Sequence, residues 1–155
     1  TIDEGPISEL VKDWLRVIDY LQTREDIDVS RLAYFGESLG GFMGCYISGP
    51  KDPRFKVCYL GIGGIPTWEQ PRPEHDPVNY VPRITIPVLM INGQYDSIFP
   101  LETSAKPMFE LLGTPEEDKC HIVIHEGEHG GWDPQRTDGE IIRFFDKYLG
   151  SPFSK

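Results

Sequence analysis

A short apolar run leads directly into a serine that stands between glycines, in Arg31-Leu32-Ala33-Tyr34-Phe35-Gly36-Glu37-Ser38-Leu39-Gly40-Gly41. The run is compatible with a β-strand, and the small residues after it are compatible with a helix. In such a sequence the serine occupies a strained turn between the strand and the helix, where its hydroxyl is exposed. Glycines are needed two residues before and after it, because side chains there would collide with the turn and the neighbouring strand. Ser38 is therefore a candidate nucleophile, and the backbone N–H of Leu39 is a candidate oxyanion donor. The alternative is a glycine-rich turn with a surface serine.

The length and charge of the chain limit the classes of protein to which it can belong. Its 155 residues predict a single domain, 1–155, that is long enough to bury a core. No apolar run approaches the ~18 residues that a membrane-spanning helix needs. The net charge of −10 would repel nucleic acids and anionic membrane surfaces, so we expect neither as a partner.

Helical and extended hydrophobic patterns alternate along the chain. They predict helices over residues 7–24, 40–47, 104–112 and 139–149, and strands over residues 31–35, 55–62, 84–91 and 121–124. This alternation is typical of an α/β fold, here with about four parallel strands and helices on both faces of the sheet. Residues 63–83 contain five prolines and no clear period, which predicts a long loop.

Two further segments present a candidate acid and a candidate base. Asp96 follows the apolar strand pattern of residues 84–91 in a polar turn, where the acid of a catalytic triad would be presented. His129 lies beyond the last predicted strand, in a loop bracketed by glycines. Along the chain these residues come in the order Ser38, Asp96, His129. Among the folds that carry a catalytic triad of serine, acid and histidine, this order distinguishes one fold from the rest. The alternative for Asp96 is an ordinary turn aspartate.

The other histidines and the cysteines are weaker candidates. His121 and His125 follow a strand pattern and predict packing or edge positions, and His75 in the long loop is the second candidate for a catalytic histidine. His121, His125 and His129, with Glu126 and Glu128 between them, could suggest a metal site, but histidines four residues apart suit a helix and this stretch resembles a strand, so neither a metal nor a cofactor is expected. Three cysteines in apolar stretches predict free, buried thiols and favour a reducing, cytoplasmic compartment: Cys45, Cys58 and Cys120.

The segments around Ser38 and Asp96 resemble those of a known superfamily. Residues 28–41 and residues 87–96, with Pro100, are similar to the nucleophile and acid strands of α/β-hydrolases, and within them of the dienelactone hydrolase, acetyl xylan esterase and prolyl-oligopeptidase-like group. The resemblance runs from the first predicted helix to the last. It implies that Ser38 is the nucleophile, that His129 is the general base and then acid, and that Asp96 orients His129.

The chain also departs from the pattern of that superfamily. Family members have strands and helices before the nucleophile strand, and a loop there donates the second oxyanion N–H. Here about 30 residues precede Gly36 and predict one helix, so we expect a carboxyl-terminal half of a hydrolase domain and an incomplete N-terminus. The strand from Arg31 to Phe35 would then be an exposed edge that is prone to association. We expect a homodimer through this edge, or one piece of a larger chain.

These features together predict a serine carboxylic-ester hydrolase that acts on small esters through an acyl-enzyme. Four aromatic residues are candidate walls of its pocket: Trp68, Tyr80, Tyr95 and Phe99. One alternative is a serine peptidase of the oligopeptidase-like kind. Another is a weakly active or inactive interaction module, because loss of an oxyanion donor costs on the order of 100- to 1,000-fold in rate.

Overall fold

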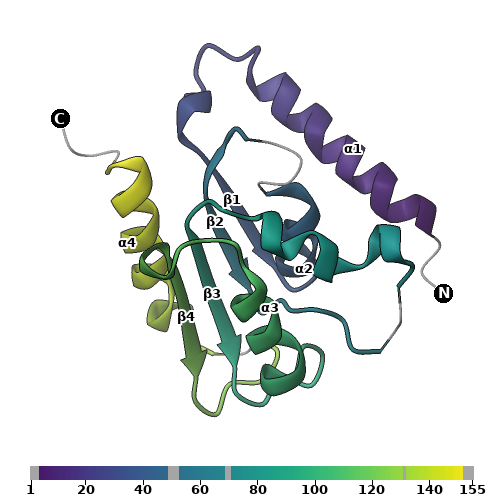
Figure 1. Cartoon of the computed structure of the whole chain (residues 1–155). Helices are drawn as coiled ribbons and strands as arrows, with labels where there is room; N and C mark the ends of the chain where they lie inside the picture. Colours follow the sequence, from purple (N-terminus) through teal and green to yellow (C-terminus); the bar gives the residue numbers. More distant parts are fainter. Residues whose placement is uncertain (1–3, 49–52, 69–70, 131, 152–155) are drawn as a thin grey trace.

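A parallel sheet forms the centre of the structure (Figure 1). The computed structural model describes residues 4–48, 53–68, 71–130 and 132–151. Within them, β1 (Leu32–Glu37), β2 (Phe55–Gly61), β3 (Val88–Gly93) and β4 (Lys119–Ile124) form one sheet in that order, with parallel pairing throughout. The α-helices of this part are α1 (Glu4–Leu21), α2 (Leu39–Ile47), α3 (Lys106–Leu111) and α4 (Asp138–Leu149). The predicted α/β fold with four parallel strands is confirmed. None of the helices described is long and apolar enough to cross a membrane.

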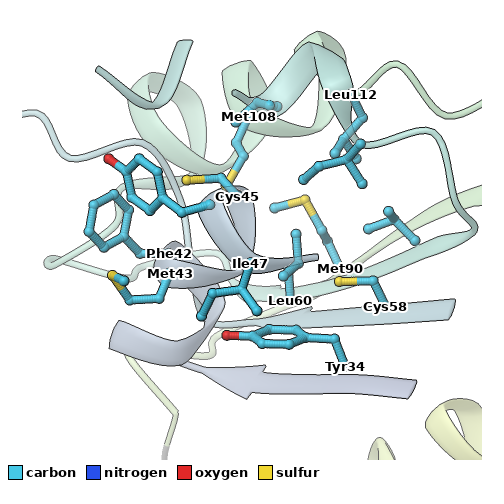
Figure 2. Close-up of a cluster of buried hydrophobic side chains, with 14 of the residues drawn as sticks. Tyr34, Phe42, Met43, Cys45, Ile47, Cys58, Leu60, Met90, Met108 and Leu112 are labelled. Carbon is cyan, nitrogen blue, oxygen red and sulfur yellow. The ribbon is translucent and has the colours of Figure 1, made fainter. Parts of the chain in front are cut away.

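Helices cover both faces of the sheet, as predicted. α1, α2 and α3 lie on one face and α4 on the other (Figure 1). Because successive strand residues point to opposite faces, Leu60 and Met90 join the core beneath α2 and α3 (Figure 2). Tyr59 and Leu89 instead pack with Ile141 of α4. β3 is buried along its whole length, and β2 at all but one position, which explains their nearly continuous apolar sequences.

Several elements begin or end away from their predicted limits. α1 starts and ends three residues earlier than predicted, and the predicted helix 104–112 begins as a π-helical turn, η5 (Leu101–Ala105), that continues into α3. β3 begins only at Val88, because Pro87 has no N–H to donate to a sheet ladder. The carbonyl of Ile86 instead accepts a hydrogen bond from the hydroxyl of Thr114.

The predicted long loop contains regular turns. Three single turns of 3₁₀-helix divide it: η2 (Pro73–His75), η3 (Pro77–Asn79) and η4 (Val81–Arg83). Each has a proline at its first or second position, where the fixed φ of proline suits a helix start. Residues 69–70 of this segment lie outside the described residues.

The strand β1, which leads to Ser38, lies at an edge of the sheet that the described residues form, as predicted. Tyr34 of β1 is buried between Trp14 of α1 and Phe55 of β2. On the opposite face, Phe35 packs against Tyr59 and remains 53% exposed. Beside this edge, α1 carries a row of exposed apolar side chains: Leu10, Trp14, Val17 and Tyr20.

The three cysteines are free, but they do not share one environment. Cys45 and Cys58 are buried as predicted, and burial raises the pKa of the Cys58 thiol to about 12. Cys120 is exposed, which corrects the prediction that all three are buried. It lies on β4, which pairs with β3 on one side and has no strand on its other side among the described residues.

Candidate active site

Ser38 lies at the turn between β1 and α2. Its φ of 54° and ψ of −114° belong to a region that residues with side chains rarely adopt. Two backbone hydrogen bonds hold the turn. The N–H of Ser38 donates to the carbonyl of Gly61 at 2.9 Å, and the carbonyl of Ser38 accepts from Phe42 at 3.0 Å. Strain of this kind persists only where the surroundings impose it, and it is common at functional sites.

Glycines permit this turn, but not all in the predicted way. A Cβ at Gly36 would lie 2.5 Å from the carbonyl carbon of Gly40 and 2.7 Å from the ring of Tyr34. A Cβ at Gly41 would lie 2.5 Å from the carbonyl oxygen of Gly61. A Cβ at Gly40 would meet no described atom within 4 Å, so the predicted collision at this position is wrong. The close approaches involve Gly36 and Gly41.

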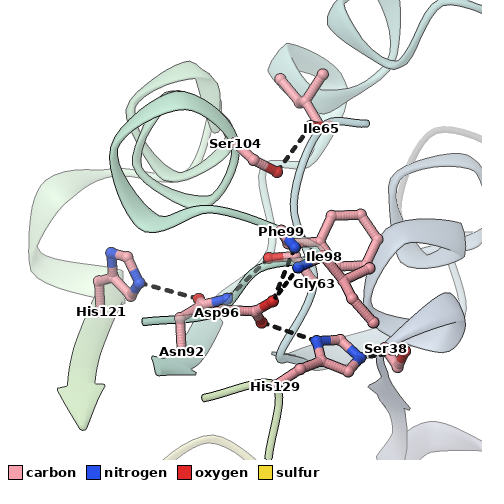
Figure 3. A network of polar contacts seen from close by, with 10 residues as sticks. All are labelled: Ser38, Gly63, Ile65, Asn92, Asp96, Ile98, Phe99, Ser104, His121 and His129. Atoms are coloured by element: carbon pink, nitrogen blue, oxygen red, sulfur yellow. Dashed lines mark hydrogen bonds and ion pairs between the residues drawn. The ribbon is translucent and has the colours of Figure 1, made fainter. Parts of the chain in front are cut away.

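His129 connects Ser38 to Asp96 (Figure 3). Its Nε2 lies 2.7 Å from Oγ of Ser38, and its Nδ1 lies 2.8 Å from Oδ2 of Asp96. Because a carboxylate only accepts hydrogen bonds, Nδ1 of the neutral imidazole carries the proton that is donated to Asp96. Nε2 is then free to accept from the hydroxyl of Ser38. The structure thus brings together the three side chains that the sequence singled out.

Asp96 is fixed by the backbone that follows it. Its Oδ1 accepts the N–H groups of Ile98 and Phe99, both at 2.8 Å, so Oδ2 is left for His129. The Asp96 side chain has no exposed surface, whereas 19% of the His129 side chain is exposed. The carboxylate is thus shielded from solvent while the imidazole remains reachable. This is the arrangement in which an acid orients a base.

A direct backbone contact sets the distance between the turn that carries Asp96 (the acid turn, residues 93–96) and the loop that carries His129 (the histidine loop, residues 125–130). The N–H of Tyr95 donates to the carbonyl of Gly127 at 2.7 Å. Gly93 makes this approach feasible, because a Cβ there would lie 2.5 Å from the carbonyl oxygen of Gly127 and closer still to that of Glu128. A hydrogen bond from the N–H of Gly130 to the carbonyl of Glu128 closes a tight turn with His129 at its tip. The role of Gly93 was not predicted from the sequence, although a glycine at a strand end signals a close backbone approach.

The remaining histidines are not part of this arrangement. His121 lies on β4, stacks on Phe109 and bonds Asn92, and burial together with the charge of Lys106 lowers its pKa to about 4. His125 is exposed and contacts Gln94. These positions agree with the predicted packing and edge roles. His75, the second candidate base, lies in η2, whereas His129 is the histidine that contacts Ser38. Among the described residues, no group of three metal-ligating side chains could hold a metal ion.

The backbone N–H of Leu39 is the first of α2. The first N–H groups of a helix have no intrahelical acceptor, and the helix dipole favours negative charge beside them. Leu39 follows Ser38 directly, so this N–H lies next to the place where a carbonyl attacked by Ser38 would develop charge.

One of the four predicted aromatic wall residues, Phe99, lies beside His129, and a second, Trp68, packs against Phe99. The ring of Phe99 is 6.0 Å from that of His129, and the ring of Trp68 is 5.4 Å from that of Phe99. Phe99 is buried and Trp68 is exposed, so this aromatic pair extends from the core to the surface. Tyr80 packs instead against Tyr46, and the nearby Tyr95 is largely exposed.

Comparison with known proteins agrees with this geometry. The family model "PETase: PET hydrolase-like" matches residues 14–148. The chain belongs to the PET hydrolase-like family. This PET hydrolase-like chain is 29% identical over 136 residues to an uncharacterized protein of Mycobacterium tuberculosis, with 80% of this chain and 46% of that protein covered. It is 28% identical over 118 residues to cutinase est2 of Thermobifida alba, with 72% and 35% covered.

The structure has the α/β-hydrolase fold in part. It superimposes on the acetyl xylan esterase from Paenibacillus sp. R4 with a TM-score of 0.75 at 23% identity, covering 90% of this chain and 52% of the esterase. The predicted resemblance to α/β-hydrolases is therefore confirmed. The PET hydrolase-like chain spans 46% of the length of the mycobacterial protein and 35% of the length of the cutinase.

Proposed function

We propose that this chain carries the catalytic residues of a serine carboxylic-ester hydrolase that acts through an acyl-enzyme. The observation that carries the proposal is the pair of hydrogen bonds, at 2.7 Å and 2.8 Å, that joins Ser38 to His129 and His129 to Asp96. A serine hydroxyl is a weak nucleophile until a neighbouring base accepts its proton, and Nε2 of His129 occupies that position. Membership in the PET hydrolase-like family and the similarity to a cutinase support ester substrates.

In the proposed acylation step, Oγ of Ser38 bonds to the ester carbonyl carbon while its proton moves to Nε2 of His129. The electron pair of the carbonyl bond goes to the oxygen, which the N–H of Leu39 stabilises. The bond to the alcohol oxygen then breaks, and His129 returns the proton to the departing alcohol. Water attacks the acyl group on Ser38 in the same way, so the carboxylic acid leaves and the Ser38 hydroxyl is restored.

We propose small esters with an apolar acyl group as substrates. Phe99 packs beside His129, and the exposed ring of Trp68 packs at a tilt against Phe99, where it offers apolar area and no charge. Aromatic side chains of this kind bind apolar and aromatic groups through burial and ring packing.

The partner proposal follows from the exposed edge. β1 has no neighbour on one side within the described residues, and Ser38 follows directly at its carboxyl end. A strand that joined β1 in parallel would end beside Ser38, where its following loop could donate a second oxyanion N–H. We propose that a second copy of this chain, or a further part of a larger chain, covers this edge and the exposed row of α1.

A fluorophosphonate probe tests the proposed function, because it reacts covalently only with an activated serine. We expect the folded protein to be labelled at Ser38 and to hydrolyse 4-nitrophenyl acetate, and Ser38→Ala to lose both. Ser48→Ala is the matched control, because Ser48 lies at the other end of the same helix, where its hydroxyl bonds the carbonyl of Gly44. This control should be labelled at the wild-type rate.

The same assay separates the alternatives. No labelling of correctly folded protein would favour the interaction module. Faster release from N-acylated peptides than from esters would favour a peptidase. Full turnover by Ser38→Ala would remove Ser38 from the mechanism.

A further inference from the structure

Asn92 is a fully buried amide that connects three segments of the proposed site. It lies at the end of β3, four residues before Asp96. Its Nδ2 donates to the carbonyl of Gly63 at 2.9 Å, and its Oδ1 lies 3.0 Å from Nε2 of His121 on β4 (Figure 3). Both ends of the amide are therefore engaged, one in the loop after β2 and the other on β4.

These contacts fix the protonation of His121. Because Nδ2 of Asn92 is the donor to Gly63, its Oδ1 can only accept, so Nε2 of His121 must carry a proton. His121 also stacks on Phe109 of α3, with ring centroids 5.1 Å apart, which holds the imidazole in place. Its lowered pKa, about 4, means that the neutral ring is the form present near pH 7. His121 therefore acts as a fixed, uncharged donor that orients the amide of Asn92.

The other end of the connection reaches the first turn of α2. The backbone of Gly63 lies so close to Gly41 that a Cβ at Gly63 would be 2.6 Å from the carbonyl carbon of Gly41 and 2.9 Å from the N of Phe42. This turn of α2 follows Ser38 and contains the N–H of Leu39. Ile62, just before Gly63, has a φ of 41°, which is uncommon for a β-branched residue and shows that the loop is held under strain.

We propose that Asn92 is a positioning residue for the reaction of Ser38. Held by His121, its amide fixes the loop after β2 against the first turn of α2, and so keeps Ser38 and the N–H of Leu39 aligned with His129. This inference rests on the proposed function, since it assigns Asn92 a part in that reaction. It explains why a polar amide, and not another apolar side chain, occupies a completely buried position of β3.

Asn92→Asp is the direct test, because it keeps the shape of the side chain while it replaces the donor NH₂ group by a second carboxyl oxygen. A carboxylate oxygen would face the carbonyl of Gly63 with no proton between them, so that bond is lost. We expect kcat for 4-nitrophenyl acetate to fall by about 10- to 100-fold while KM changes less than about 3-fold, since the reacting groups shift and the binding surface does not. The labelling rate of Ser38 should fall with kcat.

A pair of His121 variants keeps the test decisive if Asn92→Asp does not fold. His121→Gln offers an amide N–H where Nε2 of histidine stood, so it should retain kcat within about 2-fold. His121→Leu offers no donor and should lose about 10-fold in kcat. Thr114→Val is the control for a purely structural loss, because it removes a buried hydroxyl that bonds the carbonyl of Ile86, before the start of β3. It should lower the melting temperature and leave kcat unchanged.

NMR of ¹⁵N-histidine-labelled protein tests the hydrogen bonds between His121, Asn92 and Gly63 without an activity assay. We expect His121 of the wild type to be the neutral Nε2–H tautomer from about pH 5 to pH 8. We also expect the His129 nitrogen shifts to move in His121→Leu but not in His121→Gln. If the wild type is not labelled by the probe, the proposed function fails, and these shifts still decide the role of Asn92. A His121 that titrates near pH 6.5, or equal kcat and unchanged His129 shifts in His121→Leu, would overturn the inference.

Discussion

Oδ2 of Asp96 accepts the Nδ1 proton of His129 at 2.8 Å, while the other oxygen of the same carboxylate is occupied by two backbone N–H groups. The carboxylate cannot rotate without giving up those two bonds. The orientation of the imidazole is therefore set by the backbone of the turn from Asp96 to Phe99, through a single side chain.

Asp96→Asn is predicted to leave the fold intact and to reverse the tautomer of His129. The amide oxygen would keep the N–H groups of Ile98 and Phe99, so its NH₂ group would face Nδ1 of His129. The imidazole would then carry its proton on Nε2 and could not accept from Ser38. We expect kcat to fall by about 10⁴-fold with little change in melting temperature. Asp28→Asn, which alters an exposed turn aspartate that bonds the N–H of Ser30, should retain full turnover.

The glycines of the serine turn should respond unequally to alanine. Gly36→Ala places a methyl group against Gly40 and Tyr34, and we expect it to lower the free energy of unfolding by about 1–3 kcal/mol. Gly40→Ala meets no described atom within 4 Å and replaces a helical glycine, so it should raise that energy by about 0.4–1 kcal/mol. Urea unfolding of the two variants measures the difference. A destabilised Gly40→Ala would contradict the open space seen there.

His121 should make the protein less stable in acid. Its pKa is lowered to about 4 when folded, whereas histidine in an unfolded chain titrates near 6.5. Between these pH values the unfolded state binds the extra proton, so stability is present above about pH 6.5 and is lost as the pH falls toward 4. We expect wild type to lose about 2 kcal/mol more than His121→Gln over this range, allowing for the partial exposure of the ring. Urea unfolding at several pH values checks this. The exposed His125→Gln should follow the wild type.

Trp68 is predicted to select the acyl group. Trp68→Ala removes the exposed ring that packs against Phe99, the neighbour of His129, and should raise KM for aromatic and longer acyl esters by about 10-fold. Turnover of acetyl esters should change little, because an acetyl group has little apolar area to bury against an indole ring. Ile142→Ala on α4 removes an exposed apolar side chain that belongs neither to this aromatic pair nor to the row on α1, and should leave both KM values unchanged.

The edge strand gives a prediction about assembly. Light scattering after size exclusion should show a mass above that of the 17.6 kDa chain, because the edge of β1 and the apolar row of α1 are both exposed. Phe35→Lys places a charge on this edge and should shift the protein toward the monomer without unfolding it. A wild type that remains monomeric at high concentration would rule out the homodimer.

Side-chain patterns and chain order allowed much of this structure to be predicted. The apolar runs of β2 and β3 indicated strands that are buried on both faces, and the glycines around Ser38 indicated the turn. The candidate residues Ser38, Asp96 and His129 could be identified because each follows a strand, and parallel strands bring their carboxyl ends to one edge of the sheet.

The rest depends on contacts that local sequence does not encode. Nothing near Asn92 shows that its amide spans from β4 to the loop after β2, since Gly63 and His121 are each 29 residues away. The role of Gly93 likewise depends on a backbone 34 residues further along. The prolines of residues 73–83 indicated breaks in regular structure, but their 3₁₀ turns depend on tertiary packing as well as on a fixed φ.

The contact between the acid turn and the histidine loop has a consequence for how freely this surface can change. The position of His129 is set by main-chain bonds of Tyr95 and Gly130 and by the missing side chain at Gly93. The exposed side chains of His125 and Glu128 carry none of these bonds. Substitutions at these two positions can therefore alter the charge beside His129, while the distance between His129 and Ser38 stays the same.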